Sequence, residues 1–503
     1  MLISQSKIVD MKRLILLSLL VGFLGFQSCS DKDDKILVPE NLLLKNFVWQ
    51  GLHQYYLWQN EVTDLRDDRF GDQDQVNAFL ATKDSPETLF QDLLNKPVSK
   101  YPLPGEAVDR FSVMVSDYTV LENLFAGKST TNGVDFGLKY KTGSTTELFG
   151  WVRYVLSNSD GNSKGVKRGD IFYAIDGIPL TVSNYKTLLS QTTATYNMAD
   201  YAAGNIVPNN KSVTLVKSAD VYENPVAFSQ IIIIQGKTTG YLMYNAFIPS
   251  NESLLNEIFN QFKAANITNL ILDLRYNSGG SVDTARRLAS MITGQFNNQV
   301  FAKQIWNSKL QPQFESSNPA ALNILFTDKL ANNVALNSIN MSKLYVITSK
   351  STASASELII NGLKPYIDVI QIGDTTTGKN TASITLYDSP DFSATDRSTK
   401  HKYAMQPLVL KLQNSAGFSD YATGLVPTTV ALEDLGNLDA LGTVTEPLLK
   451  LALFQISLAG KAPIFDGKKF NDFSDSKNLT PFGTELHLDQ VPAEFYSTFR
   501  KNN

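Results

Sequence analysis

A buried run that ends in paired glycines decides the fold: residues 270–280 read LILDLRYNSGG. Its first five residues place one aspartate among four apolar side chains, which is typical of a strand buried on both faces of a sheet. Gly279 and Gly280 follow this strand. Paired glycines allow close backbone approach and positive φ angles, so their N–H groups can point into a cavity. We therefore expect a buried strand whose end supplies backbone donors to a site.

Two later segments repeat this arrangement of a buried strand followed by a polar loop. Strand 344–348 precedes STASASE at 351–357, which leads into a helix, and strand 369–373 ends in GDTTTGK at 373–379. An amphipathic helix is expected over 254–265. Because buried strands alternate with helices, the sequence predicts an α/β region with a largely parallel sheet, and the loops at the strand ends are available for a site.

The segment before this α/β region divides into two parts. Residues 41–128 are predicted to form an N-terminal helical domain, because apolar side chains recur there at three-to-four spacing. Ser85 and Pro86 mark the start of a second helix, with serine at the cap and proline at the first helical position. Residues 129–224 instead show short strands separated by turns, which predicts a β-rich domain.

The β-rich domain carries a recognisable pattern, with GVKRGDI at 165–171 followed by AIDG at 174–177. This order resembles that of a PDZ domain. The resemblance implies that Gly137 and Leu138 belong to a loop that offers N–H groups to a peptide, which would add a strand to the sheet edge. Lys139 departs from the small or apolar residues usual after that loop. Plain turn chemistry is the alternative explanation of the Gly-Asp and Asp-Gly pairs.

The N-terminus has the pattern of a signal peptide. Lys12 and Arg13 precede an apolar run at 14–26, which is too short to span a bilayer as a helix. The only cysteine, Cys29, follows the run, so a disulfide within the chain is impossible. Its position resembles a bacterial lipobox, which predicts a signal peptide at 1–28, lipidation at Cys29 and a polar tether at 29–40. We expect an envelope protein anchored to a membrane, most simply the outer one, through its lipid.

Composition excludes several classes of function. The formal net charge is −4, which offers no basic excess for a nucleic-acid backbone. No cluster of histidine, cysteine and acidic residues has metal-ligand spacing, so neither a metal nor another cofactor is expected. Residues 373–380 resemble a phosphate loop, but Asn380 stands where a magnesium-binding serine or threonine is required. A nucleotide site is therefore not predicted there.

Taken together, the segments LDLRYNSGG, STASASE and GDTTTGK resemble, in this order, the carboxy-terminal processing (tail-specific) proteases. The resemblance implies an α/β protease core at 225–460, a mostly parallel sheet with crotonase-like ββα units, followed by a C-terminal extension at 461–503. It also implies that Ser354 is the nucleophile and Lys379 its general base, 25 residues later. Backbone N–H groups of Ala355 and of Gly279 or Gly280 would form the oxyanion hole, and Glu357 and Thr376 would support the pair.

The residues are consistent with this chemistry. A serine hydroxyl needs a base, and none of the three histidines, His53, His401 and His487, lies in a motif that places it on Ser354. A lysine can act as the base if burial lowers its pKa from about 10.4 towards about 7–8. We therefore expect Lys379 to be buried and unpaired.

Each of these segments also has a purely structural explanation. Ser354 and Glu357 fit a helix capping box, and the glycine segments fit ordinary turns. The predicted function is an envelope-anchored serine endopeptidase that cleaves unstructured or C-terminal tails of proteins through an acyl-enzyme. The alternative is a catalytically inactive PDZ-containing lipoprotein that binds peptides. A sugar-handling surface protein is disfavoured, because no pair of neighbouring carboxylates is evident.

Overall fold

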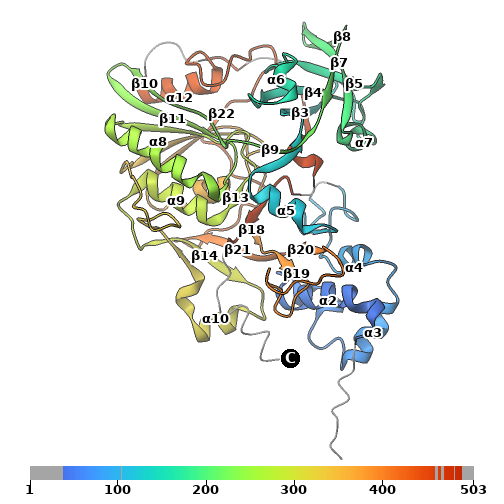
Figure 1. The fold of residues 1–503 in the computed structure, drawn as a ribbon. Coiled ribbons are helices and arrows are strands. Elements are labelled where there is room, and N and C mark those ends of the chain that lie inside the picture. Colours follow the sequence, from blue (N-terminus) through green and yellow to red (C-terminus); the bar gives the residue numbers. More distant parts are fainter. Residues whose placement is uncertain (1–37, 104, 459–462, 466–469, 481, 490–503) are drawn as a thin grey trace, which may run out of the picture.

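This computed structural model describes residues 38–103, 105–458, 463–465, 470–480 and 482–489. The predicted signal peptide, Cys29 and most of the predicted tether lie outside these residues. In the part of the chain that is described, no helix has both the length and the apolar character needed to cross a membrane. The chain forms several sheets and a helical N-terminal region (Figure 1).

The central sheet confirms the predicted strands and their direction. Its order is β10-β11-β12-β16-β17-β22, with β10 antiparallel to β11 and every later pair parallel. The three sequence motifs follow β12, β16 and β17, so parallel pairing brings their loops to one edge. The strands are β10 Val226–Ile234, β11 Lys237–Tyr244, β12 Asn269–Asp273, β16 Lys343–Thr348, β17 Asp368–Gly373 and β22 Thr429–Val430.

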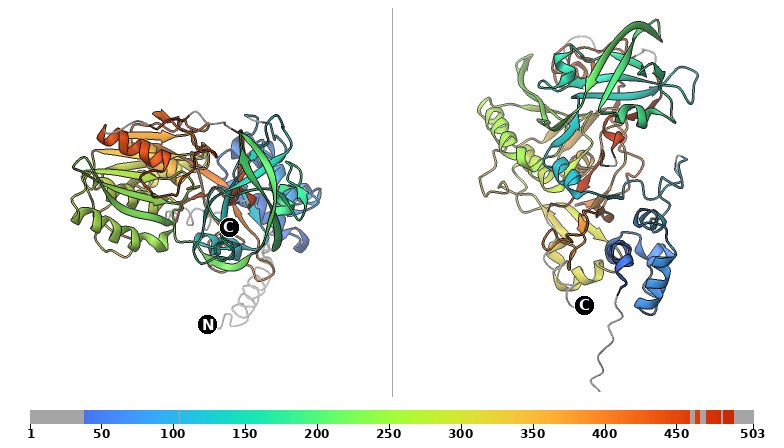
Figure 2. Two further views of the ribbon diagram at one scale, coloured as in Figure 1. Left: turned by 90° about the horizontal axis from the view of Figure 1, so that it is seen from above. Right: turned by 45° about the vertical axis from the view of Figure 1, so that its right-hand side comes forward.

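Helices cover both faces of the central sheet because its strands are apolar on both sides. Leu270 and Leu272 of β12 share a core with α8, α9 and α11, whereas Ile271 between them belongs to a core with α12. Figure 2, left, shows the layers from above, with α12 (red) across the sheet from the green and yellow helices. The bounds are α8 Glu252–Ala264, α9 Val282–Thr293, α11 Ala355–Leu363 and α12 Pro447–Ser457.

A second sheet, of mixed direction, was not predicted. Its order is β13-β24-β18-β21-β14-β15, and it begins at Gly280, directly after the glycine motif. Its second strand comes from the C-terminal extension, a polar stretch without a recognisable sequence pattern. The strands are β13 Gly280–Ser281, β24 Leu486–His487, β18 Thr381–Ser383, β21 Leu408–Asn414, β14 Val300–Trp306 and β15 Asn323–Leu325, with helix α10 Gln311–Ser317 between the last two.

The N-terminal region is largely helical, as predicted, and Ser85 caps α4 with Pro86 in its first turn. The region also contains strands: β1 joins β20 and β19 in a three-stranded sheet, and β2 pairs with β9. Strand pairing with distant segments is invisible to local periodicity. The elements of this region are α2 Leu43–Tyr55, α3 Gln73–Ala81, α4 Pro86–Asp92, β1 Val113–Val115, α5 Tyr118–Phe125 and β2 Lys128–Thr131. The strands that pair with them come from later in the chain: β9 Ser218–Tyr222, β19 Leu386–Tyr387 and β20 Ala404–Gln406.

The β-rich domain at 129–224 has a seven-stranded sheet of order β23-β3-β4-β5-β7-β8, with β6 paired to β5. Gly137 and Leu138 lie inside β3 rather than in a loop, which corrects the sequence interpretation. The outer neighbour of β3 is β23, from the C-terminal extension. The elements are β3 Val134–Tyr140, β4 Leu148–Val155, α6 Asp160–Ser163, β5 Ile171–Ile175, β6 Ile178–Pro179, α7 Tyr185–Ser190, β7 Thr193–Ala202, β8 Asn205–Val216 and β23 Asp472–Asp475.

A buried ionic network joins this domain to the central sheet. Arg275 is fully buried and lies 2.7 Å from both Asp273 and Glu446, and 3.4 Å from Glu433. Arg168 of the β-rich domain contacts the same Glu433 at 2.6 Å. Burial alone favours the neutral acid, but the two guanidinium groups outweigh it and lower the pKa of Glu433 from 4.5 to about 2.

We predict that Glu433→Gln lowers the free energy of unfolding by about 3–5 kcal/mol at pH 7, because it leaves buried guanidinium groups undercompensated. The folded pKa of Glu433 lies below its unfolded value, so its contribution is present above pH 4.5 and is lost as the pH falls towards 2. Urea unfolding across that pH range measures both effects. Glu257→Gln on the exposed face of α8 is the control; equal stabilities of the two variants would contradict the prediction.

Candidate active site

Ser354 stands at the N-terminus of α11 in a strained conformation. Its φ and ψ are 64° and −117°, a backbone conformation that residues other than glycine rarely adopt. Such strain costs about 1–3 kcal/mol and is concentrated at functional sites. The preceding loop is fixed against the glycine motif, since the Ala353 N–H donates to the Asn277 carbonyl at 3.1 Å. The side chain of Ser354 is fully buried.

One buried carboxylate ties the Ser354 segment to the Lys379 segment. Glu357 accepts hydrogen bonds from the backbone N–H groups of Ser354 at 2.8 Å, Gly378 at 2.7 Å and Lys379 at 2.8 Å. The hydroxyl of Thr376 donates to it at 2.5 Å. Burial raises the pKa of Glu357, although these donors oppose the shift. Glu357 and Thr376 therefore position the two predicted catalytic segments against each other.

Lys379 is fully buried, as predicted, but it is not unpaired. Its Nζ lies 5.0 Å from the ring centre of Phe111, donates to the Thr484 carbonyl at 2.5 Å and lies 3.6 Å from the Glu485 carboxylate. Burial lowers the pKa of Lys379 below its ordinary 10.5, while Glu485 opposes that shift. The expectation failed because the C-terminal extension supplies both partners.

A peptide carbonyl lies against the serine. Ser354 Oγ donates to the Glu485 carbonyl oxygen at 2.5 Å, and the Gly280 N–H donates to the same oxygen at 2.6 Å. The Gly279 N–H donates instead to the Asn277 side chain at 2.9 Å. The N–H group of Gly280 thus points at the Glu485 carbonyl oxygen, whereas that of Gly279 does not. Ala355 is the first residue of α11 and follows Ser354 directly.

Both glycines are required by the geometry. A Cβ on Gly279, at φ 118°, would lie 2.5 Å from Ser354 Oγ, and one on Gly280, at φ 133°, would lie 2.3 Å from the Phe247 carbonyl oxygen. No hydrogen bond between Ser354 Oγ and Lys379 Nζ is found among the described residues, and each polar group instead contacts the C-terminal segment.

Sequence reasoning missed several neighbours of Lys379. Phe111 presents its ring to the amine, and Arg110 donates to the carbonyls of Gly378 and Ala422. Glu485 comes from a segment with no recognisable pattern. None of these residues belongs to a local motif, and they lie about a hundred positions or more along the chain from Lys379, so the sequence offered no signal for them.

Asp368 and the three histidines pair with residues other than Ser354 and Lys379. Asp368, the nearest acid after α11 in the sequence, pairs with Lys343 at the start of β17. His53 and His401 contact Asp67 and Asp388 at 3.4 and 2.9 Å. His487 follows Glu485 by two positions, but its nearest acidic partner is Asp489, at 3.5 Å. Within the described ranges no group of three or more potential metal ligands occurs.

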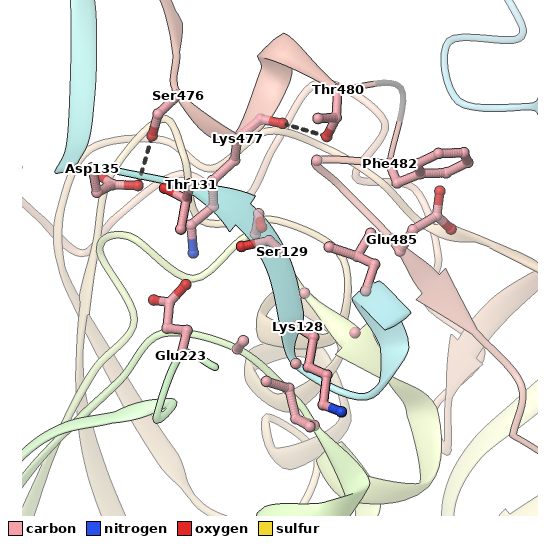
Figure 3. Close-up of a pocket in the computed structure, with 18 of the residues that line it drawn as sticks. Lys128, Ser129, Thr131, Asp135, Glu223, Ser476, Lys477, Thr480, Phe482 and Glu485 are labelled. Carbon is pink, nitrogen blue, oxygen red and sulfur yellow. Dashed lines mark hydrogen bonds between the residues drawn. The ribbon is translucent and has the colours of Figure 1, made fainter. Parts of the chain in front are cut away.

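A cavity of about 240 Å³ begins at the two glycines (Figure 3). Phe125, Ile248 and Phe482 give it apolar walls, and Lys128 and Glu223 place charges around it. Figure 3 shows that its walls come from β2, β3 and the C-terminal extension together. A second chain segment could therefore lie beside the glycine motif.

Comparison with known proteins identifies the family. Residues 238–404 match the model of peptidase family S41, and residues 44–113 match that of the peptidase S41 N-terminal domain. A solved structure from Bacteroides fragilis NCTC 9343, assigned to the S41 proteases, superposes with a TM-score of 0.60 at 25% identity. The match covers 82% of this chain and 98% of that one. Both matched regions are thus similar to peptidase family S41, which confirms the family expected from the three motifs.

Two curated relatives carry names of the same kind. The chain is 24% identical over 365 residues to the chloroplastic carboxyl-terminal-processing peptidase 2 of Arabidopsis thaliana, and 22% identical over 311 residues to the carboxyl-terminal-processing protease of Picosynechococcus. The matches cover 68% and 60% of this chain. The aligned region spans 61% of the Arabidopsis relative and 69% of the other.

We predict that Glu357→Gln lowers the free energy of unfolding by about 1–3 kcal/mol, because its amide group offers fewer acceptors to four buried donors. The substitution should weaken the local structure around Glu357 more than it lowers the stability of the whole fold. Hydrogen exchange at the amides of Ser354, Gly378 and Lys379 should accelerate in the variant. Glu315→Gln, at an exposed position of helix α10, is the matched control. Unchanged exchange at all three amides would show that Glu357 does not hold the segments.

Proposed function

We propose that this chain is a serine-type endopeptidase that cleaves proteins through an acyl-enzyme on Ser354, with Lys379 as general base. One observation supports this best: a peptide carbonyl oxygen lies 2.5 Å from Ser354 Oγ and 2.6 Å from the Gly280 N–H. A site that accommodates a peptide carbonyl between a buried hydroxyl and a backbone donor suits acyl transfer.

In the proposed reaction Ser354 Oγ attacks the carbonyl carbon while Lys379 Nζ accepts the hydroxyl proton. The Gly280 N–H stabilises the negative charge that develops on the oxygen, assisted by the Ala355 N–H and the N-terminal end of α11. The C–N bond then breaks, and the amine leaves with the proton carried by Lys379. Water hydrolyses the resulting ester with the lysine again acting as base.

The burial of Lys379 suits it to this role. A base must be neutral when it accepts a proton, and burial of the Lys379 amine lowers its pKa, which disfavours the charged ammonium. The face of Phe111 has the opposite tendency, because an aromatic face attracts a cation. Glu485 also opposes the effect of burial, because its carboxylate stabilises the ammonium. The lysine is therefore better suited to act as a base when the Glu485 side chain has left.

Peptide capture, membrane anchoring and the class of substrate are part of the same proposal. The β-rich domain would act as a PDZ-like module that captures peptides by adding a strand beside Gly137 and Leu138, because β3 accepts an outer strand there. Lipidation of Cys29 would hold the enzyme at the cell envelope. Substrates would be unstructured or C-terminal tails of proteins, since a buried site admits an extended chain more readily than a folded one.

A second candidate is an inactive peptide-binding lipoprotein. It is favoured by the contacts of Ser354 Oγ and Lys379 Nζ, which both donate to the C-terminal segment rather than to each other. This alternative expects peptide binding without turnover. The two candidates differ in whether Ser354 reacts.

We predict that Ser354→Ala and Lys379→Arg each lower the rate of casein hydrolysis by about 10³-fold or more, as expected when a nucleophile or its base is removed. Arginine keeps the positive charge but cannot give up its proton. Casein cleavage and labelling of Ser354 by a fluorophosphonate probe measure the two effects. Lys343→Arg at the exposed start of β16 is the control for the charge-conserving change. Wild-type rates in Ser354→Ala would rule out the proposed mechanism.

We predict that kcat/KM rises with pH and levels off with a midpoint below 10.5. Only neutral Lys379 accepts the proton, and burial lowers the pKa of Lys379 from that value. Activity is therefore lost as the pH falls through the pKa of Lys379. The measurement is kcat/KM for a peptide substrate across the range in which the chain stays folded. A profile that decreases with rising pH would contradict the assignment of Lys379 as base.

A further inference from the structure

The C-terminal extension passes directly through the candidate active site. Strand β24 lies between β13 and β18, with Gly280 opposite Leu486 and both Ser281 and Ser383 opposite His487, all parallel. Adjacent strands lie about 4.8 Å apart, so the slot that β24 fills is one strand wide. An extended polypeptide could take its place by making the same backbone bonds.

The segment just before β24 contacts both predicted catalytic residues. The Glu485 carbonyl oxygen accepts from Ser354 Oγ, the Thr484 carbonyl accepts from Lys379 Nζ, and the Glu485 carboxylate lies 3.6 Å from that Nζ. The Ser354 proton is thereby directed at a carbonyl oxygen instead of at the base. The ammonium form of Lys379 is held by two acceptors, so this arrangement favours an idle site over a reacting one.

Apolar and polar contacts fix the segment on both sides of Ser354. Leu486 is fully buried in the main core, and the ring of His487 stacks on that of Phe125 at 4.0 Å. Ser281, at the start of α9, donates to the Asp489 carboxylate. These contacts give the segment a defined register.

The same extension also occupies the edge of the β-rich domain. Strand β23 pairs antiparallel with β3, placing Ser474 opposite Leu138. The ring of Phe473 contacts Tyr140 of β3 at 5.3 Å and Tyr185 of α7 at 5.1 Å. Both places proposed above for a substrate, the sheet edge and the catalytic slot, are therefore filled by one stretch of this chain.

A polar contact connects these two places. Asp475 at the end of β23 accepts from Ser351 Oγ at 2.6 Å and lies 3.2 Å from the Arg153 guanidinium. Ser351 belongs to the loop that carries Ser354. The extension thus touches the β-rich domain, the nucleophile loop and the lysine in succession along its length.

We propose that the described parts of the extension, 470–480 and 482–489, are an intramolecular inhibitor that lies along the substrate path. Extended polypeptide substrates enter by displacing 482–489 and pair with β13 in the same direction. This inference rests on the proposed function. Because the inhibitor is tethered, its effective concentration is high, and even a weakly binding segment can keep most molecules closed.

The decisive variant is Leu486→Asp in the full chain. A charged side chain cannot remain in the apolar core, so the segment should leave the slot. We expect casein hydrolysis to rise about tenfold or more, because the competent fraction of molecules limits the apparent activity. Leu458→Asp is the matched control, since Leu458 is 78% exposed, and its activity should equal that of the wild type. An unchanged or lower rate in a folded Leu486→Asp chain would overturn the proposal.

Glu485→Gln gives a second test that preserves side-chain volume. It removes the carboxylate near Lys379 while leaving the strand pairing of β24 intact. A modest rise in rate is expected, smaller than that of Leu486→Asp. No rise in either variant would count against the inhibitor.

A binding experiment separates this inference from the proposed function. The synthetic peptide FGTELHLD, the sequence of 482–489, is titrated into the Ser354→Ala, Leu486→Asp double variant by fluorescence anisotropy. Saturable binding is expected, together with none for the same peptide carrying aspartate at the Leu486 position. Peptide binding without casein cleavage by any variant would rule out the protease function, but not the binding of segment 482–489 in the slot. Equal rates of casein cleavage by the wild type, Leu486→Asp and Glu485→Gln, without peptide binding, would rule out the inhibitor alone.

Discussion

The buried carboxylate of Glu357 is the interaction on which the candidate site depends. A carboxylate removed from water is costly unless its oxygens are fully hydrogen-bonded, and Glu357 has four donors. Three of these are backbone N–H groups of Ser354, Gly378 and Lys379. The requirement to satisfy one buried charge therefore fixes the relative position of two loops that follow different strands of the sheet.

The central sheet supplies the framework within which that carboxylate acts. Parallel pairing of β12, β16 and β17 brings the ends of all three strands to one edge. Arg275, two residues after the end of β12, is compensated by Asp273, Glu446 and Glu433. A second buried ionic group thus anchors the glycine segment beside α12 and, through Arg168, beside the β-rich domain. The Glu357 network thus holds the loops after β16 and β17, and the Arg275 network holds the end of β12.

Occupation of the slot by the C-terminal segment explains the contacts that the candidate pair, Ser354 and Lys379, makes. Lys379 is buried partly because Thr484 and Glu485 cover it, so its environment belongs to the closed arrangement. When Glu485 leaves, the amine loses the carboxylate that most favours its charged form, which shifts the balance towards the neutral form, although Asp109 still favours the ammonium. Access of substrate and activation of the base would then be coupled through one displacement.

Local patterns in the sequence determined the three strand ends, the family and the pair Ser354 and Lys379 as candidates. Apolar runs and glycines encode buried strands and tight turns over a few residues, and that information survives without knowledge of the rest of the chain. The helix beginning at Pro86 was predictable for the same reason. The polar extension gave no such signal, and Gly137 and Leu138 were assigned to a loop although they lie within β3.

Only the tertiary structure decided what surrounds the pair. Glu485, Phe111 and the donor role of Gly280 depend on strands pairing across hundreds of residues, as β13 does with β24 and β1 with β20. Such pairing is set by which edges remain free once the core has formed, not by the composition of a short segment. The sequence by itself therefore determined which residues could perform the chemistry, whereas long-range strand pairing decided what they contact.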